Sequence, residues 1–280
     1  MRLKIACIVW IAASGLVLGA LPARAADADE APDLLNEPFY AALGSYILNS
    51  DTKVRLDGSG QHGNRVDWEN TFGGGDQTRF RIDGYWRFGE RHKVRALWFS
   101  SSTTESRRLD RDIHWGDETF PLSARAEGQI KFDIYELAYE YAFLRRENYE
   151  VTGTIGLHYT EFSARISAKA ETSNGTLEQD ISQKASVGAP LPVLGLRGMW
   201  GLPHHFWLDA SAQVFALSID NISGNVQDYK IALFWQPKKW LGLGLGYNQF
   251  GVNVDVGKDR FDGSLDWTYR GPMLFYSGAF

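Results

Sequence analysis

The last ten residues of the chain read Gly271-Pro272-Met273-Leu274-Phe275-Tyr276-Ser277-Gly278-Ala279-Phe280. Counting back by twos from Phe280 gives a mostly apolar set: Gly278, Tyr276, Leu274 and Pro272. A period of two is the signature of a β-strand with one apolar face. Ending on a bare aromatic is unusual for a soluble domain, because termini usually fray into solvent. We expect this strand to close a sheet by pairing with the first strand, which leaves no free edge.

The segment from Arg79 to Phe88 has the same period with a sharper contrast between its faces. Its apolar face consists of Phe80, Ile82, Gly84, Trp86 and Phe88. Its polar face consists of Arg79, Arg81, Asp83, Tyr85 and Arg87. Charged side chains in such numbers are unusual in a soluble core but ordinary in the polar interior of a membrane β-barrel.

The spacing of the strands predicts their number and connections. Four short turns, near residues 90, 146, 203 and 238, alternate with longer polar stretches, one of them from Ser167 to Ser186. Short periplasmic turns and long external loops are the asymmetry of bacterial barrels. The pattern therefore predicts an all-β fold, an antiparallel transmembrane β-barrel of about ten strands, within a range of roughly eight to twelve.

The N-terminus predicts export. Basic Arg2 and Lys4 precede an apolar run from Ile5 to Leu21 and the sequence Ala23-Arg24-Ala25. This order is typical of a signal peptide, and the run is short for a retained membrane anchor. We expect a signal peptide over 1–25, an acidic periplasmic tail over 26–37 and a single barrel domain over 38–280.

Composition excludes several kinds of chemistry. Cys7 is the single cysteine among 280 residues and lies in the predicted signal peptide, so the mature chain has no disulfide and no cysteine-based metal site or nucleophile. We predict no cofactor, no metal site and no nucleic-acid partner. The mean hydropathy of −0.28 looks soluble, but a barrel also does, because only alternate residues face lipid.

Aromatic residues make up 14% of the chain, with ten Trp. Many of them flank the short turns, and Trp and Tyr prefer the membrane–water interface. We expect an aromatic girdle on the periplasmic side, formed by Trp86, Phe88, Tyr141, Phe143, Trp200, Trp207, Trp235 and Trp240. The alternative, a large soluble β-sandwich, has no need to place aromatics beside alternate turns only.

A set of charged residues shares the phase opposite to these aromatics. The predicted interior charges are Arg79, Arg81, Asp83, Arg95, Glu136, Glu140, Arg197, Asp209, Asp228 and Lys230. We expect Arg95 to lie roughly opposite Glu140. The set is either a salt-bridged plug or the lining of a pore, and the plug is favoured because side chains can fill a barrel of this size. Inward Gly242, Gly244 and Gly246 would free space along one wall, which keeps a channel open as an alternative.

The histidines give little support to catalysis. His62 and His114 fall in external loops, and His158 faces inward while Glu161 has the opposite phase. No Ser-His or Asp-His spacing matches a known catalytic arrangement, so no catalytic residue is predicted. Arg107, Arg108 and Arg111 lie in an external loop with acidic neighbours and could meet lipopolysaccharide phosphates.

The terminal pattern resembles the C-terminal signature of bacterial outer-membrane β-barrel proteins, which implies an assembly signal at Phe280, Tyr276 and Leu274. Over its mature length the chain resembles small barrels of the OmpA-like and OmpW-like kind. That resemblance implies an outer-membrane location and a structural or narrow-channel role. The alternatives are an enzyme acting on lipid or peptide at the barrel rim, or a surface adhesin acting through its loops. The expected partners are outer-membrane lipids, lipopolysaccharide, periplasmic chaperones and the barrel-assembly machinery, and we expect a monomer.

Overall fold

The computed structural model describes residues 30–59, 62–73, 77–171, 177–219, 222–258 and 261–280. The predicted signal peptide, 1–25, therefore lies outside the described residues, and the predicted tail is described from residue 30. No helix within the described ranges is both long enough and apolar enough to cross a membrane.

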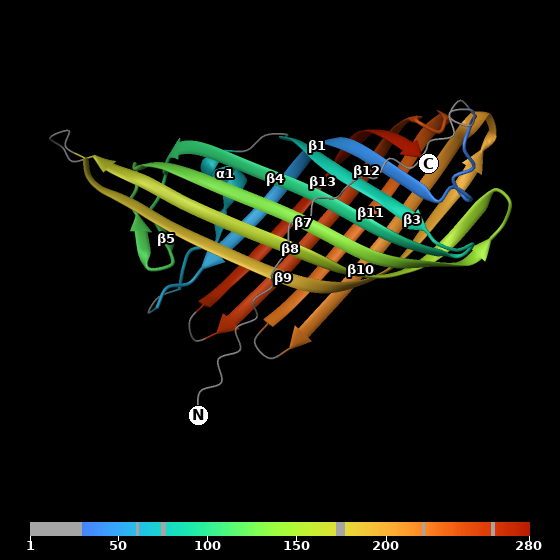
Figure 1. Ribbon diagram of the computed structural model, residues 1–280. Helices are drawn as coiled ribbons and strands as arrows, with labels where there is room; N and C mark the ends of the chain where they lie inside the picture. The colour runs from blue at the N-terminus through green and yellow to red at the C-terminus, as the bar shows by residue number, and fades with distance from the viewer. Residues whose placement is uncertain (1–29, 60–61, 74–76, 172–176, 220–221, 259–260) are drawn as a thin grey trace, which may run out of the picture.

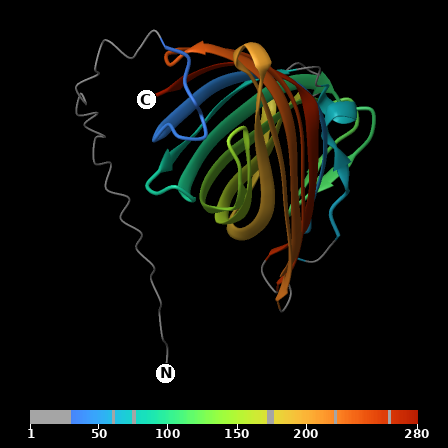
Figure 2. The same ribbon diagram turned by 90° about the vertical axis from the view of Figure 1, so that its right-hand side faces the viewer.

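Ten antiparallel strands form a closed barrel (Figures 1 and 2). In spatial order they are β1 (Phe39–Leu56), β3 (Gln77–Arg87), β4 (His92–Arg108), β7 (Arg125–Arg145), β8 (Tyr149–Glu171), β9 (Leu177–Leu202), β10 (Phe206–Ile219), β11 (Ile222–Lys238), β12 (Leu241–Lys258) and β13 (Phe261–Ala279). The fold class and the strand number predicted from the sequence are confirmed.

The first and last strands close the barrel. Tyr40 pairs with Ala279, and the same register runs on to Leu56 opposite Gly263. Phe39 N donates to Phe280 O at 3.0 Å and Phe280 N donates to Phe39 O at 2.9 Å. The terminal phenylalanine therefore completes the ladder between the two ends of the chain.

The four short turns predicted from the sequence lie at one end, which we call the short-turn end, although at the opposite end β10 and β11 (Ile219 to Ile222) and β12 and β13 (Lys258 to Phe261) are also separated by only two residues. The four turns join β3 to β4, β7 to β8, β9 to β10 through a 3-10 turn (η1, Pro203–His205), and β11 to β12. At the long-loop end, the β1–β3 connection contains β2 (Val66–Asp67) and helix α1 (Trp68–Phe72). The β4–β7 connection contains a small hairpin of β5 (Ile113–Trp115) and β6 (Glu118–Phe120).

The polar stretch expected as a loop from Ser167 to Ser186 is mostly strand, which corrects that expectation. β8 extends to Glu171 and β9 begins at Leu177. The physical reason is a change of phase along each strand. On β8, outward Leu157 and Tyr159 are the apolar set at the short-turn end, whereas inward Phe162 and Ile166 are the apolar set beyond them. If apolar residues are expected on the same face along the whole strand, the residues beyond Tyr159 look irregular and polar.

Candidate functional site: a closed lumen

The outer surface carries the predicted girdle beside the short turns. Trp86, Phe88, Tyr141, Phe143, Trp235 and Trp240 are 40–51% exposed, and Trp200 is half-buried. The ring of Phe39 stacks on that of Trp86 at 6.4 Å, next to the strand closure. These positions put aromatic rings at one level around the barrel, as an interfacial girdle requires.

Trp207 does not belong to this girdle. Its side chain is 7% exposed and packs in the core, while its neighbour Phe206 is 39% exposed on the outer face. The reason is strand parity: Trp207 shares its phase with Asp209, which faces the lumen. The sequence contained this signal, because the interior assignment of Asp209 already fixes the phase of Trp207.

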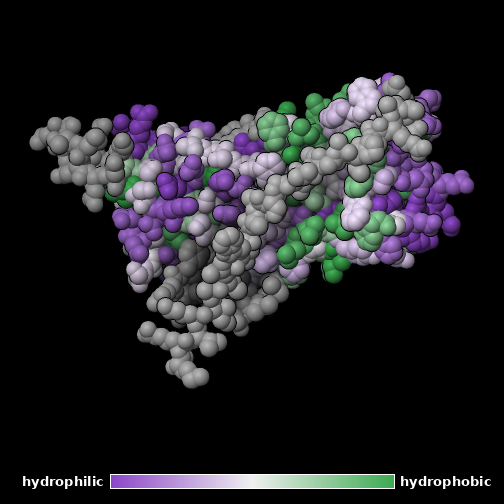
Figure 3. Space-filling view, in the orientation of Figure 1, coloured by the Kyte–Doolittle hydropathy of each residue, from purple (hydrophilic) through white to green (hydrophobic). Residues whose placement is uncertain are grey.

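A second aromatic belt, which the sequence analysis missed, lies toward the long-loop end. Its exposed members are Phe80, Trp98, Tyr135, Tyr159, Tyr229 and Tyr247. Between the two belts lies an outward band of exposed aliphatic side chains such as Leu43, Ile82, Leu137, Leu196 and Leu245. Figure 3 shows apolar surface gathered between two more polar ends. An apolar band between two aromatic belts matches the surface of a transmembrane barrel.

Inside the band, the lumen is filled by ion pairs near the short-turn end. Arg87 Nη2 contacts both Glu150 carboxylate oxygens, at 3.0 and 3.1 Å. Lys93 Nζ lies 2.5 Å from Glu150 and 3.2 Å from Glu140. Arg95 Nε donates to Glu140 at 2.7 Å, so the contact expected between these two residues is present.

The network continues across the lumen. Lys230 Nζ lies 2.9 Å from Asp209 and 3.6 Å from Asp83. Arg197 contacts Asp209 at 2.5 Å, and Arg81 contacts Asp83 at 3.4 Å. The contacts of Asp209 join the neighbouring strands β9, β10 and β11, whereas the Lys230–Asp83 contact joins β11 to β3 across the lumen.

The buried inward charges balance among the described residues. The cations are Arg81, Arg87, Lys93, Arg95, Arg197 and Lys230, and the anions are Asp83, Glu136, Glu140, Glu150, Asp209 and Asp228. Of the predicted interior charges, Arg79 differs because it is only half-buried and bonds to Ser101 and Thr103 hydroxyls. A set of charges that balances fills space as a plug does, whereas a pore ring that selects ions carries one dominant sign.

A buried dyad, Glu136 and His158, is a further feature that the sequence analysis missed. His158 Nε2 lies 3.0 Å from Glu136 Oε2, and Gln213 Nε2 donates to Glu136 Oε1 at 2.8 Å. The two residues are direct cross-strand partners on β7 and β8. A carboxylate beside an imidazole is a catalytic combination. The exposed fractions of Glu136 and His158 are 4% and 1%, and Phe250 stacks on the imidazole. The dyad is therefore shut away from substrates.

Toward the long-loop end, aromatic rings cover the ion network. Phe132 and Trp267 stack at 3.4 Å between ring centroids, and Phe250 stacks on Tyr269 at 5.2 Å. Beyond them, Trp68 and Phe72 of α1 are buried in the mouth, and the ring of Phe72 covers Gly128 of β7 so closely that a Cβ at Gly128 would lie 2.6 Å from it. The outer mouth is therefore closed by apolar packing.

Helix α1 is held in the mouth by Glu69. Thr52 donates to the Glu69 carboxylate through its backbone N–H at 2.8 Å and its hydroxyl at 2.7 Å. Burial raises the pKa of Glu69, although these hydrogen bonds act in the opposite direction. The α1 segment therefore lies over the strands as a fixed cap.

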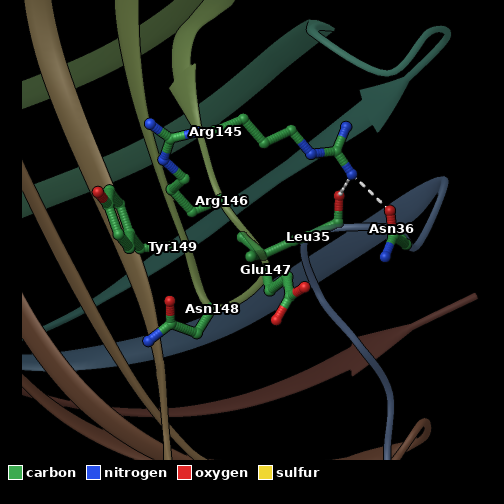
Figure 4. A pocket seen from close by; sticks show the side chains of 7 residues that line it. All are labelled: Leu35, Asn36, Arg145, Arg146, Glu147, Asn148 and Tyr149. Carbon is green, nitrogen blue, oxygen red and sulfur yellow. Dashed lines mark hydrogen bonds between the residues drawn. The ribbon is translucent and has the colours of Figure 1, made fainter.

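The tail closes the short-turn end. Leu34 and Leu35 are buried in the core, although the tail carries no strand or helix pattern. Tyr85 hydroxyl donates to Leu34 O at 2.7 Å, and Arg145 donates to Leu35 O at 2.8 Å. Figure 4 shows Arg145 reaching the tail, beside a rim pocket of about 730 Å³ that the tail and the β7–β8 turn line.

Two cavities in the interior of the described residues are small. A cavity under α1 measures about 30 Å³ and another, beside Asp83 and Lys230, about 20 Å³. Each has room for one or two water molecules. The glycine stripe on β12 does not open a channel, because Phe275 and Phe234 occupy the space in front of Gly244: a Cβ there would lie 2.2 Å from the ring of Phe275.

The loop residues considered as candidate sites in the sequence make contacts within and between the loops at the long-loop end. His114 lies 2.9 Å from the Thr119 hydroxyl within the β5–β6 hairpin, and Asp117 accepts two hydrogen bonds from Ser59. Of the loop arginines, Arg107 donates to Asn70 O at 3.0 Å. Within the described ranges, no group of three His, Cys, Asp or Glu side chains is arranged to hold a metal ion.

Comparisons with known proteins agree with this geometry at the level of fold. No protein-family model and no curated protein sequence matches the chain. Among solved structures, the outer membrane protease OmpT from Escherichia coli has a TM-score of 0.57 at 12% identity, covering 86% of this chain and 96% of OmpT. Weaker likenesses include Ail of Yersinia pestis (TM-score 0.34, 10% identity, 85% of this chain and 98% of Ail) and the toluene transporter TbuX of Ralstonia pickettii (0.36, 9%, 87% and 90%). The chain therefore shares the fold of OmpT, an outer-membrane β-barrel.

Proposed function

We propose that this chain is a bacterial outer-membrane β-barrel with a closed lumen, whose role is structural and whose outer half presents a folded sheet at the cell surface. The observation that carries the proposal is the filled lumen: a neutral ion network, an aromatic layer above it and a cap at each end. A barrel of about ten strands is narrow enough for side chains to fill it in this way.

The proposed location rests on the two aromatic belts and the apolar band between them. In this orientation the short turns face the periplasm, and residues 1–25 act as the cleaved signal peptide. The terminal strand, with Phe280, Tyr276 and Leu274, acts as the signal to the barrel-assembly machinery. Outer-membrane lipids and lipopolysaccharide surround the barrel, which works as a monomer.

A projecting wall favours a surface role as the second part of this proposal. On β8 the outward apolar residues end at Tyr159, and twelve strand residues, Thr160 to Glu171, follow. At about 3.3 Å per residue they extend roughly 40 Å along the strand. A membrane strand needs only about 9–11 residues. The remaining length of wall is available for contact with molecules outside the cell.

The filled lumen argues against the passage of solutes. It also argues against catalysis by the Glu136–His158 dyad, because substrates at the barrel rim cannot reach it. We propose a non-enzymatic role, since Glu136 and His158 lie beneath the aromatic layer. The similarity to the protease OmpT does not change this proposal, because at 12% identity it concerns the fold alone.

Planar-bilayer recording tests the closed lumen. We expect the folded, purified protein to give no reproducible conductance steps in about 1 M salt, in a bilayer where a general porin gives steps at the same protein concentration. Steps of constant size from the folded protein, absent after heat denaturation, would contradict the proposal and favour the narrow channel.

A further inference from the structure

The barrel wall splits between β9 and β10 beyond the apolar band. β9 pairs with β8 from Leu177 to Trp200, but with β10 only from Leu194 to Leu202. From Phe215 onward, β10 pairs with β11 alone. Among the described residues, the backbone of 177–193 therefore has a strand neighbour on one side only. Figure 1 shows β9 diverging from β10 toward the long-loop end.

A comparable split on the other side of the same sheet is covered. β4 pairs with β3 only as far as Ser100, yet it continues to Arg108. There α1 lies beside it, and Arg107 donates to Asn70 O in that helix. On β9, the β5–β6 hairpin contacts the inner face, where Gly116 lies beside Gln183. Among the residues that the structure describes, no backbone hydrogen bond joins this edge to the hairpin.

The edge has a defined usable length. Pro190 and Pro192 lie at its membrane end, and a proline nitrogen has no hydrogen to donate, so prolines occupy strands where the nitrogen faces an unpaired edge. Residues 177–189 contain no proline. Opposite β8 this stretch keeps a regular register from Gln179 onward. A long, regular, unpaired edge is a template for another strand.

The side chains next to the edge define the chemistry of that strand. On the outer face, exposed Lys184 lies directly across from exposed Arg165 of β8, and neither forms an ion pair within the described ranges. The outward carboxylates Glu127 and Glu161 lie at other rungs of the sheet. On β9 itself, Glu178 and Asp180 share the phase of Lys184 but lie four or more residues from it, toward the long-loop end. On the inner face, the neighbouring positions include Ile181 and buried Ala185.

A second copy of this chain does not fit the edge within one membrane. Two barrels with the same orientation are related by an axis along the membrane normal. Because barrel strands tilt by about 35–45° from that axis, two such edges would cross at roughly 70–90° and could not form a ladder. A flexible segment from outside has no such restriction.

We propose that the edge of β9, residues 177–189, binds an extended polypeptide segment as an added strand in the place that β10 leaves vacant. The segment carries acidic side chains on its outer face, opposite Lys184 and Arg165, and apolar side chains on its inner face. Main-chain hydrogen bonds give affinity and the alternating side chains give selectivity. The inference rests on the proposed surface exposure of this half of the barrel.

The test uses the full chain folded in detergent micelles and two fluorescein-labelled peptides. One alternates Val and Glu over nine residues, and the other has Lys in place of every Glu. By fluorescence anisotropy we expect saturable binding of the Glu peptide, at least tenfold tighter than that of the Lys peptide. The paired substitutions K184E and R165E reverse the preference. Equal binding of both peptides, or no binding of the Glu peptide up to about 1 mM, would overturn the proposal.

Edge geometry is tested separately from charge. S182P with S186P places prolines in the phase of Pro190 and Pro192, and we expect at least tenfold weaker binding of the Glu peptide. The matched control, S182A with S186A, leaves binding unchanged, and a heat-modifiable gel shift verifies folding of both. Unchanged affinity in the folded proline variant would mean a charged patch without strand addition, which contradicts the proposal.

Hydrogen exchange on the unsubstituted protein gives a second readout. We expect the amides of 178–188 to be slowed at least fivefold by the Glu peptide, and unchanged amides in this stretch would contradict strand addition. Conductance steps in the bilayer recording would contradict the closed lumen but would leave the peptide-binding results unchanged. Failure of the proposed function and failure of the strand-addition proposal are therefore distinguishable.

Discussion

The two halves of the lumen are filled by opposite kinds of side chain. Near the short turns the inward positions of β7 include Glu140 and Glu136, and the outward ones include Leu137. Toward the loops the same strand turns Phe132 and Ile130 inward and exposes Lys131. The half near the short turns, which we call the lower half, thus has a polar interior and an apolar exterior. The half near the loops, which we call the upper half, has the arrangement of a soluble protein, with apolar side chains inward.

This inversion identifies the solvent around each half. A wall that faces lipid must place its apolar side chains outward, whereas a wall that faces water on the outside packs them inward. The phase changes beside Asp133 on β7 and beyond Tyr159 on β8, near the second aromatic belt, and Asp133 pairs with Glu161, two residues beyond Tyr159. The phase of alternation therefore indicates where the membrane ends as well as which residues face the lumen.

The largest expected effect comes from breaking the lower half. Glu140→Leu removes the carboxylate shared by Arg95 and Lys93, which leaves buried positive charge without its partner. We expect a loss of about 3–5 kcal/mol in the free energy of unfolding. Urea unfolding in liposomes, followed by tryptophan fluorescence, measures it.

The control for Glu140→Leu is Gln129→Leu, at an exposed position of the same strand, for which we expect a change within about 0.5 kcal/mol. A loss below about 1 kcal/mol in Glu140→Leu would mean that the ion network is not the main filling of the lower lumen.

A smaller effect is expected in the upper half. Phe132→Leu keeps an apolar side chain but removes the ring that stacks on Trp267. We expect a loss of about 1–2 kcal/mol, because a near volume-conserving swap is tolerated and the aromatic contact adds only a modest amount. The same urea titration measures it. A loss as large as that of Glu140→Leu would remove the distinction between the two halves.

Much of the architecture could be predicted from the sequence, because a period of two and tight turns are local signals. These signals predict ten strands, four turns and the inward phase of residues such as Arg95 and Asp209. The prediction of Trp207 as a girdle residue was wrong because proximity to a turn was weighed above parity. The upper half of β8 and β9 was taken as a loop because the phase inversion hides an alternation that is still present.

The contact between Glu136 and His158 could not be predicted from the sequence, because it depends on the exact register between β7 and β8. A register started at the tight turn, with Arg145 opposite Glu150, would place His158 opposite Leu137. An irregularity between Ala142 and Leu144 shifts the ladder by one residue and brings His158 opposite Glu136. Bulges of this kind are set by packing around the barrel and have no reliable local signal. The split between β9 and β10 is likewise a property of the whole wall.

Cysteine accessibility tests the closed lumen most directly. In a Cys7→Ser background the chain has no other cysteine, so a single cysteine at Ala138 reports on the buried lower lumen and one at Ser102 reports on the exposed outer wall. We predict that a charged, membrane-impermeant thiol reagent labels Ser102→Cys within minutes and labels folded Ala138→Cys at least a hundredfold more slowly, with full labelling only after unfolding. Labelling of folded Ala138→Cys at a rate close to that of Ser102→Cys would show an open lumen and contradict the account.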